Sequence, residues 1–475
     1  MGTIKRYTYD WIKNFRYKDF YSIISPFTNK AIFEVPSLSK EDIDVIYEKS
    51  YQAFLKWRKT SSVKRVEMLT AWVNSLKAME AEIINAIHWE VGKSIPDCQS
   101  EFKKGISVIE DTITEFKRLQ IEGYHPTAVK TARNELALFE REPLGVILAI
   151  SPFNYPFNLS ITKLAPSLIM GNTVVFKPST NGSVTGILIT KSLYNAGFNE
   201  DQLQVITGKG SLIGEYLIKS DRIKLINYTG STATGEYISK HSKNCGLIFE
   251  MGGKDPAIVL DDCDLKLTAK QIIKGAFSFN GQRCTAVKRI LVTKDTSVKL
   301  IPHLKAEIEK LVVTNQPNTV ANITPLINIA SAQFVEDLTK DAIRHGAKVV
   351  IGNKFEDNLV YPTLLDNVSP KAKIASIEQF GPVLPIIYYD TIDEAIEIAN
   401  NTLYGLQACV FSSNLKGAIN IAQQIDTGRV TINFATERGP DRYPFTGSKS
   451  SGIGTQSTYW SLLNCSYPKG IVIAI

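Results

Sequence analysis

The fold is most clearly indicated by residues 146–176, which read VILAISPFNYPFNLSITKLAPSLIMGNTVVF. The stretch opens with a short apolar run at residues 146–150, which predicts a strand buried on both faces of a sheet. Residues 161–170 have the pattern of a helix, and residues 173–176 form a second apolar run. A strand, a helix and a strand in this order predict a βαβ unit with parallel strands.

The alternation of strands and helices continues beyond this unit. The pattern predicts further elements at residues 184–196 (helix), 203–206 (strand), 211–219 (helix), 224–228 (strand), 257–260 (strand) and 267–277 (helix). A second α/β stretch begins near residue 247 and runs to about residue 445, whereas residues 40–120 have a helical pattern. We therefore predict an α/β protein that contains a doubly wound parallel sheet.

Two further segments have the pattern of strands. Residues 136–142 are β-like and end at Pro143, and residues 469–475 form an apolar strand at the end of the chain. An apolar strand without a partner would promote aggregation. We therefore expect the terminal strand to pair within the chain or across a subunit interface.

Length and composition exclude several classes of protein. A chain of 475 residues predicts two or three domains, and 44% hydrophobic with 21% charged residues is typical of soluble globular proteins. The net charge of +7 is spread along the chain, so no nucleic-acid partner is expected. The sequence contains no secretory signal and no apolar stretch of transmembrane length, which favours a cytoplasmic protein without a membrane partner. The histidines and cysteines lack ligand-like spacing, so no metal is expected.

One thiol and one carboxylate suggest the chemistry. Cys284 lies in Asn-Gly-Gln-Arg-Cys-Thr, and Glu250 opens Glu-Met-Gly-Gly-Lys. A thiolate can add to an aldehyde carbon, and a carboxylate can activate the water that hydrolyses the resulting thioester. Either segment alone is weak evidence, because a buried cysteine is often a small hydrophobic side chain and such glycine turns are common.

Three turns could bind a nucleotide. Gly210 and the pair Gly230 and Ser231 each follow a predicted strand and open a predicted helix, whose backbone N–H groups can bind an anion. Each is equally well explained as an ordinary capped helix start. Residues 177–180, Lys-Pro-Ser-Thr, follow another strand at the sheet edge where ligands bind, and a lysine with two hydroxyls suits a phosphate.

Seven motifs in order resemble those of the aldehyde dehydrogenase superfamily, over essentially the full length of the chain. They begin at Ser151 (SPFNYP), Lys177 (KPST), Tyr228 (YTGST), Glu250 (EMGGK), Gly281 (GQRC), Glu378 (EQFGPV) and Pro444 (PFTGSK). The resemblance implies a Rossmann-like cofactor domain (1–124 and 149–247), an α/β catalytic domain (248–446) and a small β oligomerisation element (125–148 and 447–475). Relatives suggest a homotetramer.

The resemblance also implies roles for individual residues. The nucleophile falls on Cys284, the general base on Glu250, and the oxyanion-hole side chain on Asn154. The matching cofactor-binding positions are Lys177, Ser179, Thr180, Gly210, Gly230, Ser231, Glu378 and Phe380. Thr180 stands where NAD-preferring members often carry glutamate, which favours NADP.

Further residues resemble the non-phosphorylating glyceraldehyde-3-phosphate dehydrogenases of this superfamily. Their phosphate-binding positions match Arg283, Arg438 and Tyr155, with Thr285 beside the nucleophile. Lys104 matches another arginine of these enzymes, and it keeps the charge without the fork geometry. The implied reaction is oxidation of D-glyceraldehyde 3-phosphate to 3-phosphoglycerate with NADP, through a thioacyl intermediate.

Alternatives to this reaction remain open. Arginines also bind carboxylates, so another anionic aldehyde such as succinate semialdehyde is a possible substrate. A loop ion pair with Glu437 or Asp441 would also explain Arg438. A protein of another class, which retains this fold without catalysis, is the third alternative, although Cys284 and Glu250 are both present.

Overall fold

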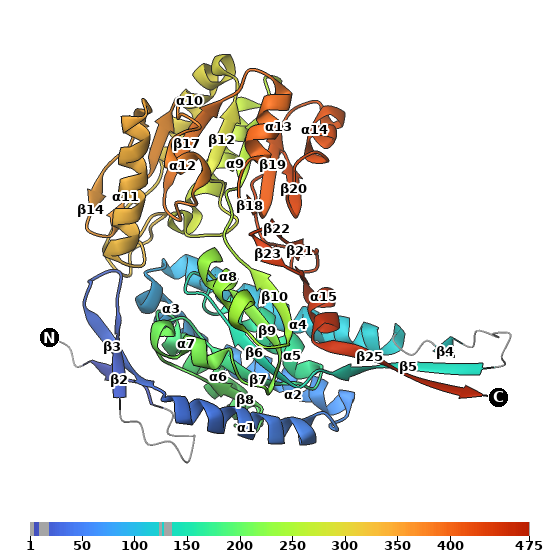
Figure 1. Cartoon of the computed structure of the whole chain (residues 1–475). Helices are drawn as coiled ribbons and strands as arrows, with labels where there is room; N and C mark the ends of the chain where they lie inside the picture. Colours follow the sequence, from blue (N-terminus) through green and yellow to red (C-terminus); the bar gives the residue numbers. More distant parts are fainter. Residues whose placement is uncertain (1–3, 9–18, 123–125, 128–134, 475) are drawn as a thin grey trace.

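The computed structural model describes residues 4–8, 19–122, 126–127 and 135–474. Figure 1 shows two α/β bodies, one above the other, and a narrow β-ribbon that projects from the lower body. Residues 125 and 128–134 of the predicted oligomerisation element lie outside the described residues, as do parts of the two ends of the chain.

The lower body is built on a six-stranded sheet whose strands are parallel except for one short edge strand. In spatial order the strands are β23 (Gly452–Ile453), β10 (Gly246–Glu250), β9 (Ile223–Thr229), β6 (Val146–Ile150), β7 (Thr173–Lys177) and β8 (Leu203–Val205). The central strand β6 is buried on both faces, which explains its uninterrupted apolar sequence. The predicted α/β class and parallel sheet are confirmed.

Helices from two parts of the chain surround this sheet, some in contact with its strands and some packed on other helices. They are α1 (Lys40–Trp57), α2 (Ser62–Ala78), α3 (Glu80–Val91), α4 (Ile95–Glu122), α5 (Asn158–Ile169), α6 (Ser183–Asn195), α7 (Gly210–Leu217) and α8 (Thr232–His241). Helix α5 begins before the predicted residue 161. The reason is tertiary, because the Glu101 carboxylate of α4 accepts hydrogen bonds from the backbone N–H groups of Phe157 and Asn158, at 2.9 and 3.1 Å.

The upper body contains a seven-stranded sheet, parallel except at its β13 edge. In spatial order its strands are β13 (Lys348–Ile351), β16 (Thr363–Asp366), β17 (Val383–Tyr388), β12 (Arg289–Val292), β11 (Pro256–Val259), β19 (Gln407–Phe411) and β20 (Arg429–Ile432). Its helical segments are α9 (Leu265–Phe277), η1 (Ser278–Gly281), α10 (Lys294–Ile308), α11 (Ile329–Arg344), α12 (Lys373–Ser376), α13 (Ile392–Asn400) and α14 (Leu415–Ala422). Apolar side chains fill both faces of the sheet.

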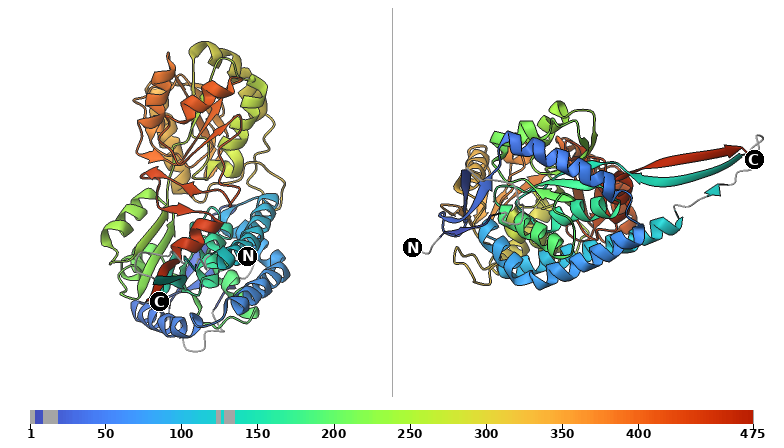
Figure 2. Two further views of the ribbon diagram at one scale, coloured as in Figure 1. Left: turned by 90° about the vertical axis from the view of Figure 1, so that its right-hand side faces the viewer. Right: turned by 90° about the horizontal axis from the view of Figure 1, so that it is seen from below.

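The projecting ribbon consists of three antiparallel strands. They are β25 (Ser466–Ala474), β5 (Glu135–Pro143) and β4 (Pro126–Thr127), in that order, and α15 (Thr458–Asn464) precedes β25. The ribbon extends well beyond the two bodies in the right-hand view of Figure 2. The predicted pairing of the terminal strand within the chain is confirmed, since β25 pairs with β5 from Ser466 to Ala474.

Smaller strands complete the structure. An N-terminal sheet contains β1 (Lys5–Arg6), β2 (Asp19–Ile24) and β3 (Ala31–Ser37), and short pairs join β14 (Phe355–Glu356) to β15 (Leu359–Val360), β18 (Tyr404–Gly405) to β22 (Ser448–Lys449), and β21 (Phe445–Thr446) to β24 (Thr455–Gln456). In the six-stranded sheet of the lower body, β10 extends to Glu250, and the short strand β23 pairs with it in the antiparallel direction. The domain boundaries inferred from the sequence stay a prediction.

Candidate active site

The loops at the carboxyl end of the six-stranded sheet meet the upper body around a pocket of about 300 Å³. Glu250 ends β10, and Cys284 follows η1 in the upper body. Seven of the residues predicted from the sequence line this pocket: Cys284, Glu250, Arg283, Arg438, Tyr155, Lys104 and Thr285. Lys93, which contacts Tyr155, lines it as well. Arg283, Cys284 and Thr285 are consecutive, but the other residues lie far from them in the sequence and meet them only through the packing of the two bodies.

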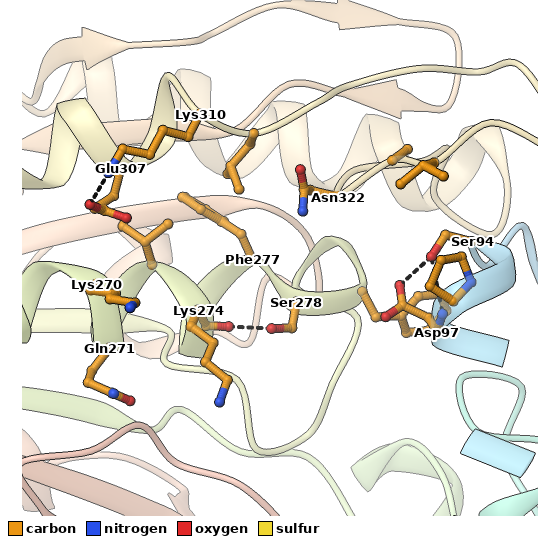
Figure 3. A pocket seen from close by; sticks show the side chains of 16 residues that line it. Ser94, Asp97, Lys270, Gln271, Lys274, Phe277, Ser278, Glu307, Lys310 and Asn322 are labelled. Carbon is orange, nitrogen blue, oxygen red and sulfur yellow. Dashed lines mark hydrogen bonds and ion pairs between the residues drawn. The ribbon is translucent and has the colours of Figure 1, made fainter. Parts of the chain in front are cut away.

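A larger pocket of about 680 Å³ adjoins this one, and Figure 3 shows its lining. The two pockets share Asp97, Ser278 and Phe279. In the larger pocket Lys310 pairs with Glu307, and the Ser278 hydroxyl donates to the backbone carbonyl of Lys274. Its lining does not include Cys284 or Glu250, so the smaller pocket is the candidate active site.

Cys284 and Glu250 are in contact. The thiol donates a hydrogen bond from Sγ to Oε1 of Glu250 at 3.8 Å. Burial and the negative charge of Glu250 raise the pKa of Cys284 to about 12, while the cations Lys288 and Arg438 act in the opposite direction. The thiol is therefore protonated at neutral pH, and Glu250 is the adjacent acceptor for its proton.

Glu250 is held by several groups. Its Oε2 atom forms an ion pair with Nη1 of Arg438 and accepts a hydrogen bond from the Thr229 hydroxyl at 3.3 Å. Behind Thr229, the buried Lys163 ammonium donates to the same hydroxyl at 2.6 Å. Arg438 also pairs with Asp441 at 3.3 Å, so the loop ion pair considered for it is present beside the Glu250 contact.

The loop that carries Cys284 has an unusual backbone. Phe279 and Asn280 have positive φ values of 48° and 58°, and Gly281 has φ 70°. A Cβ atom at Gly281 would lie 2.7 Å from the carbonyl oxygen of Gly381, which explains the glycine. The Asn280 amide bonds the backbone N–H and hydroxyl of Thr324, which stabilises this strained turn.

Asn154 lies beside the same loop. Its Nδ2 atom donates a hydrogen bond to the backbone carbonyl of Gln282 at 2.9 Å, and its own backbone carbonyl accepts from Lys93 at 2.7 Å. A side-chain amide has two N–H groups, and this bond occupies one of them. The second N–H is the one that could bind an oxyanion.

Cations surround the far end of the pocket. Arg283 donates from Nη2 to the Gly275 carbonyl at 2.5 Å, and its buried Nε has no hydrogen-bond partner among the described residues. Lys104 is 3.7 Å from Asp441 and remains partly exposed. Tyr155 packs its ring 3.9 Å from the Lys93 ammonium. A buried donor without a partner suits an anionic ligand.

Lys93 and Glu101 were not identified from the sequence. The Lys93 side chain is buried, pairs with Glu101, and lies against the rings of Tyr155 and Phe279. Lys93 follows Gly92, the left-handed C-cap of α3, so its position depends on a turn. The sequence signal for Lys93 is its position in the motif-like segment Val-Gly-Lys-Ser. Its partner Glu101 lies in the next helix, α4.

The cofactor candidates lie in three places. A separate pocket of about 560 Å³ contains Lys177 and Gly210 together with apolar side chains of α7 and α8. Burial lowers the pKa of Lys177 to about 8. Ser179, Thr180, Gly230 and Ser231 are outside the lining of this pocket, and the Ser231 hydroxyl caps α8 by accepting from the N–H of Thr234, as the alternative of an ordinary helix start predicts.

Glu378 and Phe380 lie nearer to Cys284. The Oε1 atom of Glu378 accepts a hydrogen bond from the Gly253 N–H at 3.1 Å and pairs with Lys288 at 3.2 Å. Phe380 packs edge-on against Phe153. Lys177 with Gly210 on one side, and Glu378 with Phe380 on the other, could hold the two ends of a dinucleotide.

The described side chains contain no group of three histidine, cysteine or acidic residues that could hold a metal. Within the described ranges, no helix is long and apolar enough to cross a membrane.

The chain belongs to the aldehyde dehydrogenase family, whose model matches residues 11–471. The resemblance seen in the sequence is thereby confirmed. The chain is 41% identical over 446 residues to an NADP-dependent glyceraldehyde-3-phosphate dehydrogenase of Streptococcus equinus, which covers 94% of each chain.

Two further relatives extend the comparison. The solved structure of an NADP-dependent glyceraldehyde-3-phosphate dehydrogenase from Bacillus halodurans, complexed with NADP, superimposes with a TM-score of 0.92 at 43% identity over 96% of each chain. A sulfoacetaldehyde dehydrogenase of Neptuniibacter caesariensis is 34% identical over 95% of this chain and 99% of its own. Both the family and the fold are shared along the whole length.

Proposed function

We propose that the protein oxidises D-glyceraldehyde 3-phosphate to 3-phosphoglycerate with NADP, without inorganic phosphate. The observation that carries this proposal is the Cys284–Glu250 contact within a pocket that also contains Arg283, Lys104 and Arg438. A thiol beside a carboxylate suits hydrolytic aldehyde oxidation, and three cations suit a doubly charged phosphate.

The first steps follow from the contacts of the thiol. Cys284 transfers its proton to Glu250, and the thiolate adds to the aldehyde carbon to form a C–S bond. The N–H of the Asn154 amide and the backbone N–H of Cys284 stabilise the resulting alkoxide, at about 3–4 kcal/mol per donor in comparable sites. NADP, when bound, accepts the hydride that leaves this carbon, and a thioester remains on Cys284.

Hydrolysis completes the reaction. Glu250 first releases to solvent the proton that it took from Cys284. It then removes a proton from water, the hydroxide adds to the thioester carbon, and the C–S bond breaks to release the carboxylic acid and a thiolate, which regains a proton from Glu250. The ion pair with Arg438 orients the Glu250 carboxylate in the ligand-free protein. A substrate phosphate would compete for the same guanidinium.

The cofactor assignment rests on the strand-end segment at residues 177–180. Lys177 supplies a cation, and Ser179 and Thr180 supply hydroxyls where a carboxylate would repel a 2′-phosphate. The pocket beside Lys177 has apolar walls from α7 and α8 that fit an adenine ring. Relatives that are named for NADP, or solved with it, support the same choice.

The competing proposal is an aldehyde with a carboxylate or sulfonate instead of a phosphate. The similarity to a sulfoacetaldehyde dehydrogenase gives this alternative weight. The test is steady-state NADP reduction with glyceraldehyde 3-phosphate, succinate semialdehyde and sulfoacetaldehyde, in buffer free of inorganic phosphate. We expect the largest kcat/KM for the phosphorylated aldehyde, with 3-phosphoglycerate as product. A larger value for either other substrate would refute the assignment.

We also propose a cytoplasmic homotetramer, as the resemblance implies. The long β-ribbon, with its exposed apolar side chains, supports association with further copies of the chain.

A further inference from the structure

A buried lysine lies directly beneath the nucleophile loop. Lys288 follows Cys284 by four residues, and its side chain is 1% exposed. Its ammonium donates to the backbone carbonyls of Arg283 at 2.8 Å and Cys284 at 2.7 Å, and lies 3.2 Å from Oε1 of Glu378. An ammonium has three N–H groups, so these three acceptors use all of them.

The backbone of Lys288 is fixed as well. Its N–H donates to the carbonyl of Asp255 at 2.9 Å, and its carbonyl accepts from Nε2 of Gln379 at 2.9 Å. Gln379 is the direct neighbour of Glu378 in the chain. The lysine is therefore anchored between the segment that follows Glu250 and the segment that carries Glu378.

The next residue in the chain, Arg289, is a cation with a structural role and serves as a comparison. Arg289 is also buried, but its guanidinium donates to the backbone carbonyls of Lys254, Ala375, Ile398 and Ala399, and it has no ion pair with a carboxylate among the residues that the structure describes. Arg289 thus stabilises the ends of α12 and α13. Lys288 differs because each of its three partners belongs to the proposed chemistry.

We propose that Lys288 is a positioning residue that joins the nucleophile and the substrate-binding Arg283 to the cofactor-binding carboxylate of Glu378. This inference rests on the proposed function. Lys288 and the Gly253 N–H both engage Oε1 of Glu378, and no described hydrogen bond uses Oε2. The arrangement leaves one carboxylate oxygen for a ribose hydroxyl of the dinucleotide.

The positive charge of Lys288 also affects the ionisation of the Cys284 thiol. Two carboxylates, Glu250 and Glu378, disfavour the Cys284 thiolate, while the Lys288 ammonium favours it. Buried charges are costly unless paired, and the Lys288 ammonium offsets part of the negative charge of these two carboxylates. Removing its charge should therefore make the thiol harder to ionise.

The test uses Lys288→Met, which removes the charge and all three donors, and Lys288→Arg, which keeps the charge. Two measurements need no substrate: the Kd for NADP by fluorescence titration, and the pH profile of Cys284 alkylation. For Lys288→Met we expect Kd to rise on the order of 10- to 100-fold, as when a buried carboxylate loses its charged partner. We expect the alkylation profile to shift to higher pH, with partial recovery of both in Lys288→Arg.

Folding is checked by thermal unfolding of each variant. Lys288→Gln, which keeps an amide donor for the carbonyls but no charge, serves if Lys288→Met does not fold. A folded neutral variant with wild-type Kd and alkylation profile would overturn the proposal, as would failure of all three variants to fold. Absence of glyceraldehyde 3-phosphate oxidation by the wild-type enzyme would count against the proposed substrate alone, because neither measurement uses it.

Discussion

At the scale of single residues, the state of Cys284 depends on its neighbours more than on its own sequence context. The thiol is buried beside Glu250, and its pKa is raised to about 12. Such a thiol is a weak nucleophile in the ligand-free protein. The same contact provides a route for its proton: Glu250, whose charge adds to the effect of burial on the thiol, is the base in the proposed mechanism.

This environment predicts a distinctive pH dependence for the free thiol. Alkylation requires the thiolate, so the Cys284 rate should rise about tenfold per pH unit from pH 7 to 10, without a plateau near the ordinary thiol pKa. Glu250→Gln removes the negative charge and should make alkylation faster at pH 8. Peptide-resolved mass spectrometry with iodoacetamide measures both rates. A plateau at pH 8–9 in the wild type would contradict the raised pKa.

A substitution of Arg438 would not test phosphate binding alone. It neutralises Glu250 within the pocket, and its loss leaves a buried carboxylate without its cation. We therefore expect Arg438→Ala to impair turnover of phosphorylated and unphosphorylated aldehydes alike. A selective test of phosphate binding has to use a cation that does not touch Glu250.

Lys104 meets that requirement. It lines the pocket, and its one ion pair within the described part of the chain is with Asp441, at 3.7 Å. Lys104→Ala should lower kcat/KM for glyceraldehyde 3-phosphate about tenfold, the effect of one lost charged contact, and leave glyceraldehyde unchanged. Its exposed neighbour Lys103 is outside the pocket lining, so Lys103→Ala is the matched control. An equal loss with both substrates would show that Lys104 does not contact the phosphate.

At the scale of elements, most helices and strands follow the sequence pattern, and the differences arise at helix starts. Helix α5 begins early because of Glu101, and α6 begins at Ser183 on a carboxylate from α3. Hydrophobic periodicity determines the buried face of a helix. It does not report a cap supplied by a side chain from another helix.

The α6 cap gives a prediction about stability. The buried Glu90 carboxylate accepts hydrogen bonds from the N–H groups of Gly182, Val184 and Thr185 and from the Thr185 hydroxyl. Glu90→Gln replaces one acceptor oxygen with a donor and should lower the free energy of unfolding by about 2 kcal/mol. Urea denaturation monitored by fluorescence measures the change. Glu80→Gln, on the same helix, is the control, and equal stability of both variants would contradict the cap.

At the scale of the whole molecule, the β-ribbon carries exposed apolar side chains on β25. Among the described strands only β5 pairs with β25, so one edge of β25 is open, and Ile471, Val472 and Ile473 are 54%, 60% and 44% exposed. Exposed apolar edge strands are typical sites of strand pairing between chains.

If the ribbon joins copies of the chain, charge on this edge should separate them. Val472→Lys combined with Ile473→Lys should lower the mass measured by light scattering after size-exclusion chromatography. Val298→Lys places one lysine on an exposed apolar position of α10, away from the ribbon, and should leave the mass unchanged. Wild-type mass in the ribbon variant would exclude this edge from the interface.

The order of strands and helices and the family could be inferred from the sequence, because they depend on local pattern and on motifs. The same motifs indicated Cys284, Glu250 and Asn154 as site candidates. The partners of these residues could not be inferred. Glu250 meets an arginine 188 positions away, and Lys288 meets Glu378 across two segments of the upper body. A hydrogen bond or an ion pair requires contact within a few ångströms, and the sequence carries no distances between remote segments. Those distances, and with them the protonation of the thiol, arise only when the two bodies pack together.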